Sequence, residues 1–166
     1  MIELETRIED GNGEHHLPLV RELFREYAAW LGVDLGFQDF ERELATLPGK
    51  YAPPDGCILL ARIGGEVAGC VALRPLEPNV CEMKRLWVRE AFRGRRIGER
   101  LSRAVMQRGA EIGYTVMRLD TLAHMVQAHE LYRSLGFREI APYYANPLPG
   151  AVYLETALTT QTFKTS

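Results

Sequence analysis

The 166-residue chain is poor in cysteine and has no long hydrophobic run. Its three cysteines, Cys57, Cys70 and Cys81, form no Cys-x-x-Cys pair and lie in apolar, strand-like stretches. This pattern predicts reduced core residues of an intracellular protein, without disulfides and without a metal site. No stretch approaches the ~18 apolar residues of a membrane span, and the first residues do not begin a signal peptide. We therefore expect a cytoplasmic protein with no membrane partner.

A strong charge of one sign is also missing. The chain has 20 lysines and arginines against 22 aspartates and glutamates, a formal net charge of −2. General nucleic-acid binders are usually basic overall, so this balance argues against a nucleic-acid partner. The chain also lacks repeats, linkers and low-complexity segments, and its length suits one domain. We expect a single domain over residues 1–166.

What is present is an ordered succession of strand-like and helical hydrophobic patterns. Hairpins come first, and alternating strands and helices follow, which predicts an α/β fold with a mixed sheet and helices on both faces. Helical periodicity covers His16–Leu31, Phe37–Leu47, Gly94–Ile112 and Val126–Leu135. Strand patterns cover Ile2–Ile8, Cys57–Ile63, Val67–Arg74, Val80–Val88, Thr115–Thr121, Phe137–Ile140 and Ala151–Leu158.

The most informative segment runs from Leu86 to Gly98. A short apolar strand leads into a turn rich in arginine and glycine, and an amphipathic helix follows. The first amides of a helix lack intrahelical acceptors, and the helix dipole adds partial positive charge there. Glycines let a ligand approach the backbone closely, and Arg93, Arg95 and Arg96 add positive charge. The segment therefore predicts a phosphate-binding site. The alternative is an ordinary strand-to-helix connection with solvated arginines.

A second segment, from Ala128 to Phe137, follows a predicted strand, and together the two segments resemble the GNAT superfamily of acetyl-CoA-dependent N-acetyltransferases. The family's pyrophosphate signature is Arg or Gln, two variable residues, Gly, one variable residue, and Gly or Ala. Here it runs from Arg93 to Gly98, with Arg96 in place of the central glycine. The later signature, Ala-x-x-Leu-Tyr followed by Gly-Phe, is intact, although Met125 stands where the family often has Asn. The resemblance covers roughly residues 3–157.

The resemblance implies a mixed, mostly antiparallel sheet of roughly six to seven strands, splayed at the centre, with helices on both faces. It also implies acetyl-CoA as co-substrate. The strand Met83–Val88 is expected to diverge from Thr115–Asp120, so that the pantetheine arm pairs with the free strand edge. An amide near Trp87 or Val88, with Val88 favoured, would then polarise the thioester carbonyl. The expected cofactor-binding residues are Leu86, Trp87, Val88, Arg93, Gly94, Arg95, Arg96, Ile97, Gly98 and Leu131.

Two side chains are predicted to carry the proton transfers of an N-acetyltransferase. Tyr132 is the expected general acid, because a phenol with an ordinary pKa of ~10 is protonated at neutral pH and can donate to the departing thiolate. The alternative is a core aromatic at helical spacing. Glu82 is the expected general base, because the resemblance places a carboxylate near this point of the strand, often acting through water. The alternative for Glu82 is a solvent-facing side chain.

The acceptor is expected to be the primary amine of a small molecule, which attacks acetyl-CoA directly in a ternary complex. Its pocket is expected between the first helices, the strand that carries Glu82, and the loop Tyr143–Gly150. No metal is expected, and a homodimer is expected by analogy with the superfamily alone. Four cations near this pocket could hold a carboxylate on the acceptor: Arg74, Lys84, Arg85 and Arg118.

Two other functions stay open. The chain could bind acyl-CoA as a non-catalytic sensor, although Tyr132 and Glu82 favour turnover. It could also be a nucleic-acid module that uses a cluster of arginines. The negative overall charge and the lack of stacking aromatics in that stretch argue against this second function. The arginines concerned are Arg89, Arg93, Arg95, Arg96, Arg100 and Arg103.

Overall fold

The structure, a computed structural model, describes residues 4–159 of the chain. Its seven strands form one sheet in the order β1-β2-β3-β4-β5-β7-β6. Only β4 and β5 pair in parallel, so the sheet is mixed and mostly antiparallel, as expected. The first residues of the predicted strand Ile2–Ile8 lie outside the described residues. The strands are β1 (Thr6–Asp10), β2 (Cys57–Ile63), β3 (Glu66–Glu77), β4 (Val80–Val88), β5 (Val116–Leu122), β6 (Arg138–Ile140) and β7 (Ala151–Ala157).

The four α-helices are α1 (Leu17–Leu31), α2 (Phe40–Ala45), α3 (Ile97–Ile112) and α4 (Val126–Ser134). Helix α1 ends as predicted at Gly32, whose φ of 69° is the left-handed value that glycine adopts easily. Helix α2 is shorter than the predicted Phe37–Leu47. The reason is Asp39, whose φ of 57° separates the helix from a short 3₁₀ turn over Gly36–Gln38.

Helix α3 begins three residues later than predicted. Gly94 and Arg96 both have positive φ values, 84° and 58°, which a right-handed helix excludes. The arginine- and glycine-rich segment is therefore an irregular turn that ends at the helix N-cap, Arg96.

The β2–β3 hairpin closes through a two-residue turn at Gly64 and Gly65. Both glycines have positive φ, as is typical of tight hairpins. Strand β3 extends to Glu77, beyond the predicted end at Arg74. Pro75 faces Cys81 at an irregularity of the ladder, where the missing amide of proline is tolerated.

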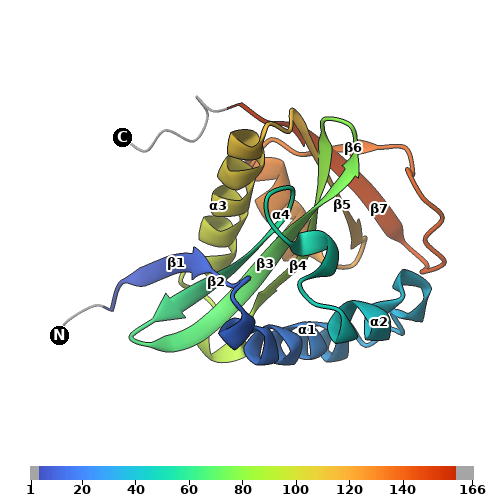
Figure 1. The fold of residues 1–166 in the computed structure, drawn as a ribbon. Coiled ribbons are helices and arrows are strands. Elements are labelled where there is room, and N and C mark those ends of the chain that lie inside the picture. Colours follow the sequence, from blue (N-terminus) through green and yellow to red (C-terminus); the bar gives the residue numbers. More distant parts are fainter. Residues whose placement is uncertain (1–3, 160–166) are drawn as a thin grey trace.

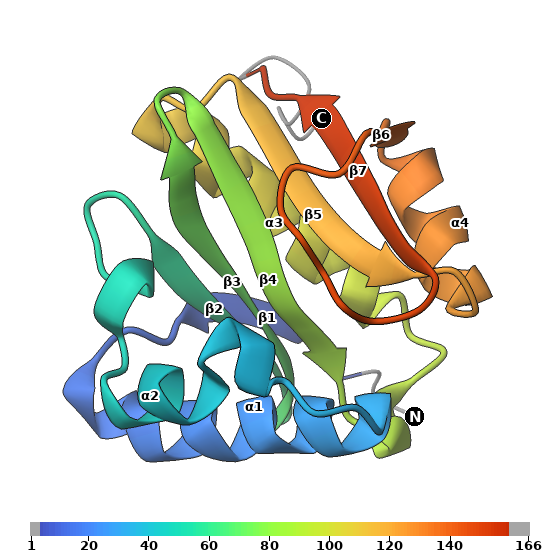
Figure 2. The same cartoon turned by 90° about the vertical axis from the view of Figure 1, so that its right-hand side faces the viewer.

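The helices cover both faces of the sheet (Figures 1 and 2). Helices α1 and α2 pack on one face, where Phe24 and Leu44 belong to a core cluster with alternate side chains of β2 to β4. Helices α3 and α4 pack on the other face, where Leu101 and Tyr132 belong to a second cluster. The strands at the centre are therefore buried on both sides, and polar side chains on them must find partners inside the protein.

The sheet opens at its centre, between β4 and β5. Main-chain pairing of the two strands covers only Val80–Glu82 and Val116–Arg118, and the strands diverge beyond it. On the opposite side of β4, two residues, Arg85 and Leu86, face the single residue Val71 of β3. This β-bulge lies at Arg85, whose φ is 62°. The predicted divergence is confirmed, and the bulge, which sequence patterns do not reveal, accompanies it.

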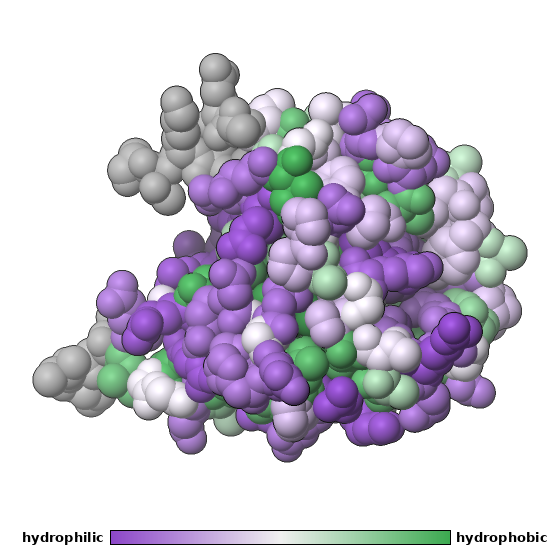
Figure 3. All heavy atoms as spheres, viewed as in Figure 1, coloured by the Kyte–Doolittle hydropathy of each residue, from purple (hydrophilic) through white to green (hydrophobic). Residues whose placement is uncertain are grey.

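The surface seen in Figure 3 is mostly hydrophilic, and hydrophobic residues form small separate patches on it. Within residues 4–159, none of the helices has both the length and the apolar character needed to cross a membrane.

The close approach of β3 and β4 next to the bulge requires a glycine at position 69. A Cβ atom there would lie 2.3 Å from the Trp87 carbonyl oxygen, a backbone atom that a rotamer change cannot move. We expect Gly69→Ala to lower the free energy of unfolding by about 2 kcal/mol, measured by urea denaturation. The control is Gly98→Ala, where the nearest side chain is 3.7 Å away and stability should hold or rise. Equal stability of Gly69→Ala and wild type would contradict this account of the bulge.

Candidate functional site

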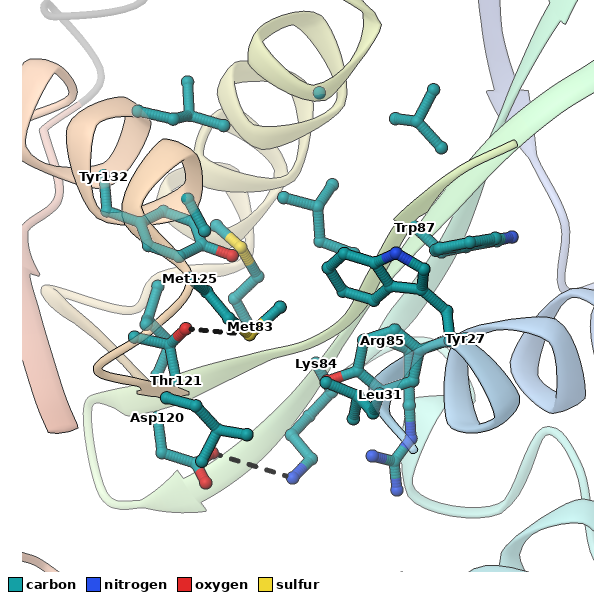
Figure 4. A pocket seen from close by; sticks show the side chains of 18 of the residues that line it. Tyr27, Leu31, Met83, Lys84, Arg85, Trp87, Asp120, Thr121, Met125 and Tyr132 are labelled. Carbon is teal, nitrogen blue, oxygen red and sulfur yellow. Dashed lines mark hydrogen bonds and ion pairs between the residues drawn. The ribbon is translucent and has the colours of Figure 1, made fainter. Parts of the chain in front are cut away.

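The divergence of β4 from β5 opens a pocket of about 340 Å³ (Figure 4). Its walls come from α1, β4, β5 and α4, together with the turn before α3 and the loop after β6. Most of the predicted site residues meet here. Of the predicted cofactor-binding set, the pocket is lined by Leu86, Trp87, Val88, Arg93, Gly94, Arg96, Gly98 and Leu131, but not by Arg95 or Ile97. Tyr132 lines it too, whereas Glu82 does not.

One end of the pocket carries free backbone amides. Within the described part of the chain, the N–H groups from Gly94 to Gly98 donate to no protein acceptor. They come together because the turn delivers them to the N-terminus of α3, where the helix dipole adds partial positive charge. Such an arrangement suits a phosphate group, and phosphate binding by this segment stays a prediction.

Arg96 occupies the central glycine position of the signature and adopts the backbone conformation that a glycine would adopt there. Its φ of 58° is left-handed, which costs a non-glycine residue about 1–2 kcal/mol. The substitution therefore keeps the course of the backbone, and its exposed side chain lies at the rim of the pocket.

Arg93 is held against the pocket wall by aromatic rings. Its guanidinium carbon lies 5.5 Å from the centre of the Trp30 ring and 5.2 Å from that of Trp87, within the range of cation–π contacts. The Trp87 indole donates to Glu26 over 3.0 Å, which fixes the ring. Arg93 thus places a cation beside the free amides; it donates to the Val88 carbonyl oxygen over 3.4 Å and is paired to no carboxylate in the described residues.

The open edge of β4 presents main-chain groups to the pocket. The Arg89 amide donates to Ala68 of β3 over 2.8 Å. Because N–H groups point to alternate sides along a strand, the Val88 amide faces away from β3, toward the divergence. An extended chain in the pocket can therefore pair with this edge as an additional strand would.

Tyr132 reaches the pocket from α4. Its ring packs edge-on against Phe137, with 5.7 Å between ring centres, and only 8% of the residue is exposed. Its hydroxyl points into the space between α4 and β4 (Figure 4), and within residues 4–159 it has no hydrogen-bond partner. Burial raises the pKa of Tyr132, so the phenol holds its proton more firmly than a phenol in water.

Glu82 lies inside the protein, next to the pocket rather than in its lining. It is 1% exposed. One carboxylate oxygen accepts a hydrogen bond of 2.9 Å from Arg74, and the other accepts one of 2.7 Å from the Tyr143 hydroxyl. The solvent-facing alternative for Glu82 is therefore wrong, because both oxygens have protein partners.

The four predicted cations differ in their availability. Arg85 is held by a two-pronged pair with Glu43, Arg74 is paired with Glu82, and Arg118 is paired with Glu155. Lys84 alone among the four lines the pocket without a hydrogen bond to a carboxylate in the described residues. These pairings join different strands, or β4 with α2 in the case of Arg85 and Glu43, and could not be deduced from spacing along the chain.

A polar network where β5 meets the loop after β6 was not foreseen from the sequence. Asp120, near the carboxyl end of β5, accepts hydrogen bonds from Tyr144 and Asn146, which fix the loop after β6. Gln38 bridges Lys84 and Tyr144. A charged residue near the carboxyl end of a strand is a usable signal for Asp120, but the loop partners carry no comparable signal.

Comparisons with known proteins agree with this geometry. The family model described as the acetyltransferase (GNAT) family matches residues 17–137. A Schizosaccharomyces pombe protein named an uncharacterized N-acetyltransferase is 45% identical over 134 residues, 80% of this chain and 82% of its own. The N-acetylaspartate synthetase of Homo sapiens is 39% identical over 99 residues, which are 59% of this chain and 33% of that protein.

Among solved structures, the PaiA N-acetyltransferase of Thermoplasma acidophilum in complex with coenzyme A has the same fold. The TM-score is 0.71, with 18% identity, and the match covers 92% of this chain and 99% of that one.

Arg96 offers a direct test of the strained turn. The free energy of unfolding of Arg96→Gly should be about 1 kcal/mol higher than that of Arg96→Ala. Both variants remove the guanidinium, but only glycine removes the strain of the left-handed backbone. Urea denaturation measures the difference. Arg95 is the matched control: its φ is not positive, so Arg95→Gly should gain nothing over Arg95→Ala. The same gain at both positions would rule out strain at Arg96.

Proposed function

Because the chain belongs to the GNAT family of acetyltransferases, we propose that it transfers an acetyl group from acetyl-CoA to the primary amine of a small molecule. The observation that carries the proposal is the row of free amides from Gly94 to Gly98 at one end of a pocket that Tyr132 also lines. A phosphate-binding end and a proton donor in one pocket are what a CoA thioester requires.

For the donor, we propose that the free amides and Arg93 bind the pyrophosphate. The pantetheine arm would then follow the open edge of β4, where the Val88 amide is available to the thioester carbonyl. A donor aimed at that oxygen stabilises the negative charge that develops on it during attack. The coenzyme A bound to the Thermoplasma acidophilum relative supports this choice of donor.

For the reaction, we propose direct attack in a ternary complex. The amine nitrogen forms a bond to the acetyl carbon while the carbon–sulfur bond breaks. The leaving sulfur takes the proton of the Tyr132 hydroxyl, and the amine gives up its proton. Tyr132 suits this role because its hydroxyl is protonated, faces the pocket and has no other partner in the described residues.

We propose Glu82 as the final acceptor of the amine proton. Its carboxylate is buried beside the pocket and hydrogen-bonded to Tyr143. Since Glu82 does not line the pocket, the proton would reach it through a water molecule or along the Tyr143 hydroxyl.

A small acceptor fits the dimensions of the site. The pocket of about 340 Å³ has to hold both the pantetheine arm and the acceptor, which leaves room for a metabolite rather than a folded protein surface. The name of the Homo sapiens relative, N-acetylaspartate synthetase, makes L-aspartate the first acceptor to try.

Replacing the phenol tests the proton donor and also separates an enzyme from a non-catalytic sensor. Tyr132→Phe should lower kcat for acetyl transfer roughly 100-fold, while the Kd for coenzyme A and the melting temperature stay unchanged, because the ring and its packing remain. Stopped-flow thiol release and calorimetry measure the two quantities. An unchanged kcat would remove Tyr132 from the mechanism, and no turnover with any amine would favour the sensor.

The pH dependence gives a second, independent check. A general acid works only while protonated, and burial raises the pKa of Tyr132 above its ordinary value of 10.0. Tyr132 therefore loses its proton only at a higher pH than an ordinary phenol. The kcat of the enzyme should not fall between pH ~7 and pH ~10. A fall within that range that disappears in Tyr132→Phe would mean that the pKa is lowered instead.

A further inference from the structure

Lys84 is a buried cation whose hydrogen-bonding capacity is only partly used. Its side chain on β4 is 5% exposed and lines the pocket. An ammonium group has three donors, yet in the described part of the chain its one hydrogen bond is to the Gln38 side-chain oxygen, at 3.1 Å. Burial lowers the pKa of Lys84, with Glu82 and Asp120 acting against that effect. A buried charge with free donors requires a further acceptor.

Asp120 faces Lys84 with one oxygen unused. Both of its hydrogen bonds, from Tyr144 and from Asn146, go to Oδ2. Its Oδ1 lies 4.0 Å from the Lys84 ammonium nitrogen, which is too long for a hydrogen bond, and within residues 4–159 this oxygen accepts no hydrogen bond. Figure 4 shows the two side chains facing each other across the pocket wall.

The neighbouring charges do not compete for these free positions. Arg85 is occupied by Glu43, and Arg74 is occupied by Glu82. The site therefore offers one free ammonium and one free carboxylate oxygen side by side. An amino acid carries the complementary pair, a carboxylate next to an ammonium.

Resting on the proposed acetyl transfer, we propose that the acceptor is an amino acid whose carboxylate binds the Lys84 ammonium and whose amino group binds Asp120 Oδ1. Both contacts replace the long Lys84–Asp120 pair by short charge-assisted hydrogen bonds. The amine is thereby held at Asp120 on β5, beside the carboxylate that binds Lys84 on β4. A polyamine lacks the carboxylate and would bring a second positive charge to Lys84, so the same site rejects it.

The test compares acceptors that differ only in the carboxylate. Acetyl-CoA-dependent thiol release is measured for a panel of L-amino acids, including aspartate, against the corresponding α-carboxamides and putrescine. Amino acids should be the better substrates. Lys84→Met should raise KM for the amino acid roughly 10- to 100-fold, leave KM for acetyl-CoA unchanged, and have little effect on carboxamides. Asp120→Asn should raise KM for both acceptor types, because both present an amine.

Lys50→Met, at an exposed lysine outside the pocket, is the control and should match wild type. Coenzyme A binding by calorimetry confirms that each variant is folded, and Lys84→Gln serves as a second, polar replacement. Carboxamides or putrescine acetylated as well as amino acids, or a KM unaffected by Lys84→Met and Lys84→Gln, would overturn the inference and leave the acetyl transfer standing.

If coenzyme A binds but no amine is acetylated, the proposed function fails. Calorimetry of the amino acid panel against the coenzyme A complex then decides the inference separately. Amino acid binding to the wild-type complex that is lost in Lys84→Met supports the inference. Absence of amino acid binding to the wild-type complex overturns it.

Discussion

The site depends on the point where main-chain pairing between β4 and β5 stops, just after Glu82 and Arg118. Beyond it, main-chain groups on the inner edge of β4 have no strand partner among residues 4–159, and an extended ligand can pair with them. The bulge at Arg85 lies in this diverging part of β4. Its left-handed backbone is compensated by the Arg85 side chain, which pairs with Glu43 and stacks on Tyr27 and Phe40. A carbonyl in the bulge, that of Arg85, also accepts from the Cys70 thiol.

Charged side chains lie near this divergence, inside a sheet that helices cover on both faces. A carboxylate or cation in such a place is stable only when paired, because desolvation costs several kcal/mol per ion. Arg74 with Glu82 and Arg85 with Glu43 meet this condition within the protein. Lys84 and Asp120 are paired only over a long distance of 4.0 Å, and both of them line the pocket. The charges that are fully paired thus support the structure, and the loosely paired ones are available to a ligand.

Much of this was predictable from the sequence, for identifiable reasons. The strands Cys57–Ile63 and Val80–Val88 and the end of α1 at Gly32 follow from apolar runs and from a glycine in a left-handed position. The free amides before α3 follow from the arginine- and glycine-rich signature. The bulge at Arg85 was not predictable, because an arginine carries no signal for positive φ. Asp120 carried a usable signal, because it is a charged residue near the carboxyl end of a strand, but its partners in the loop at residues 144 and 146 carried none.

The most direct test of the central claim is a crystal structure of the protein with coenzyme A. We expect pyrophosphate oxygens within hydrogen-bonding distance of the amides from Gly94 to Gly98, with the pantetheine arm along β4 and its sulfur beside the Tyr132 hydroxyl. Coenzyme A bound elsewhere, or β4 and β5 paired along their whole length in the complex, would contradict it.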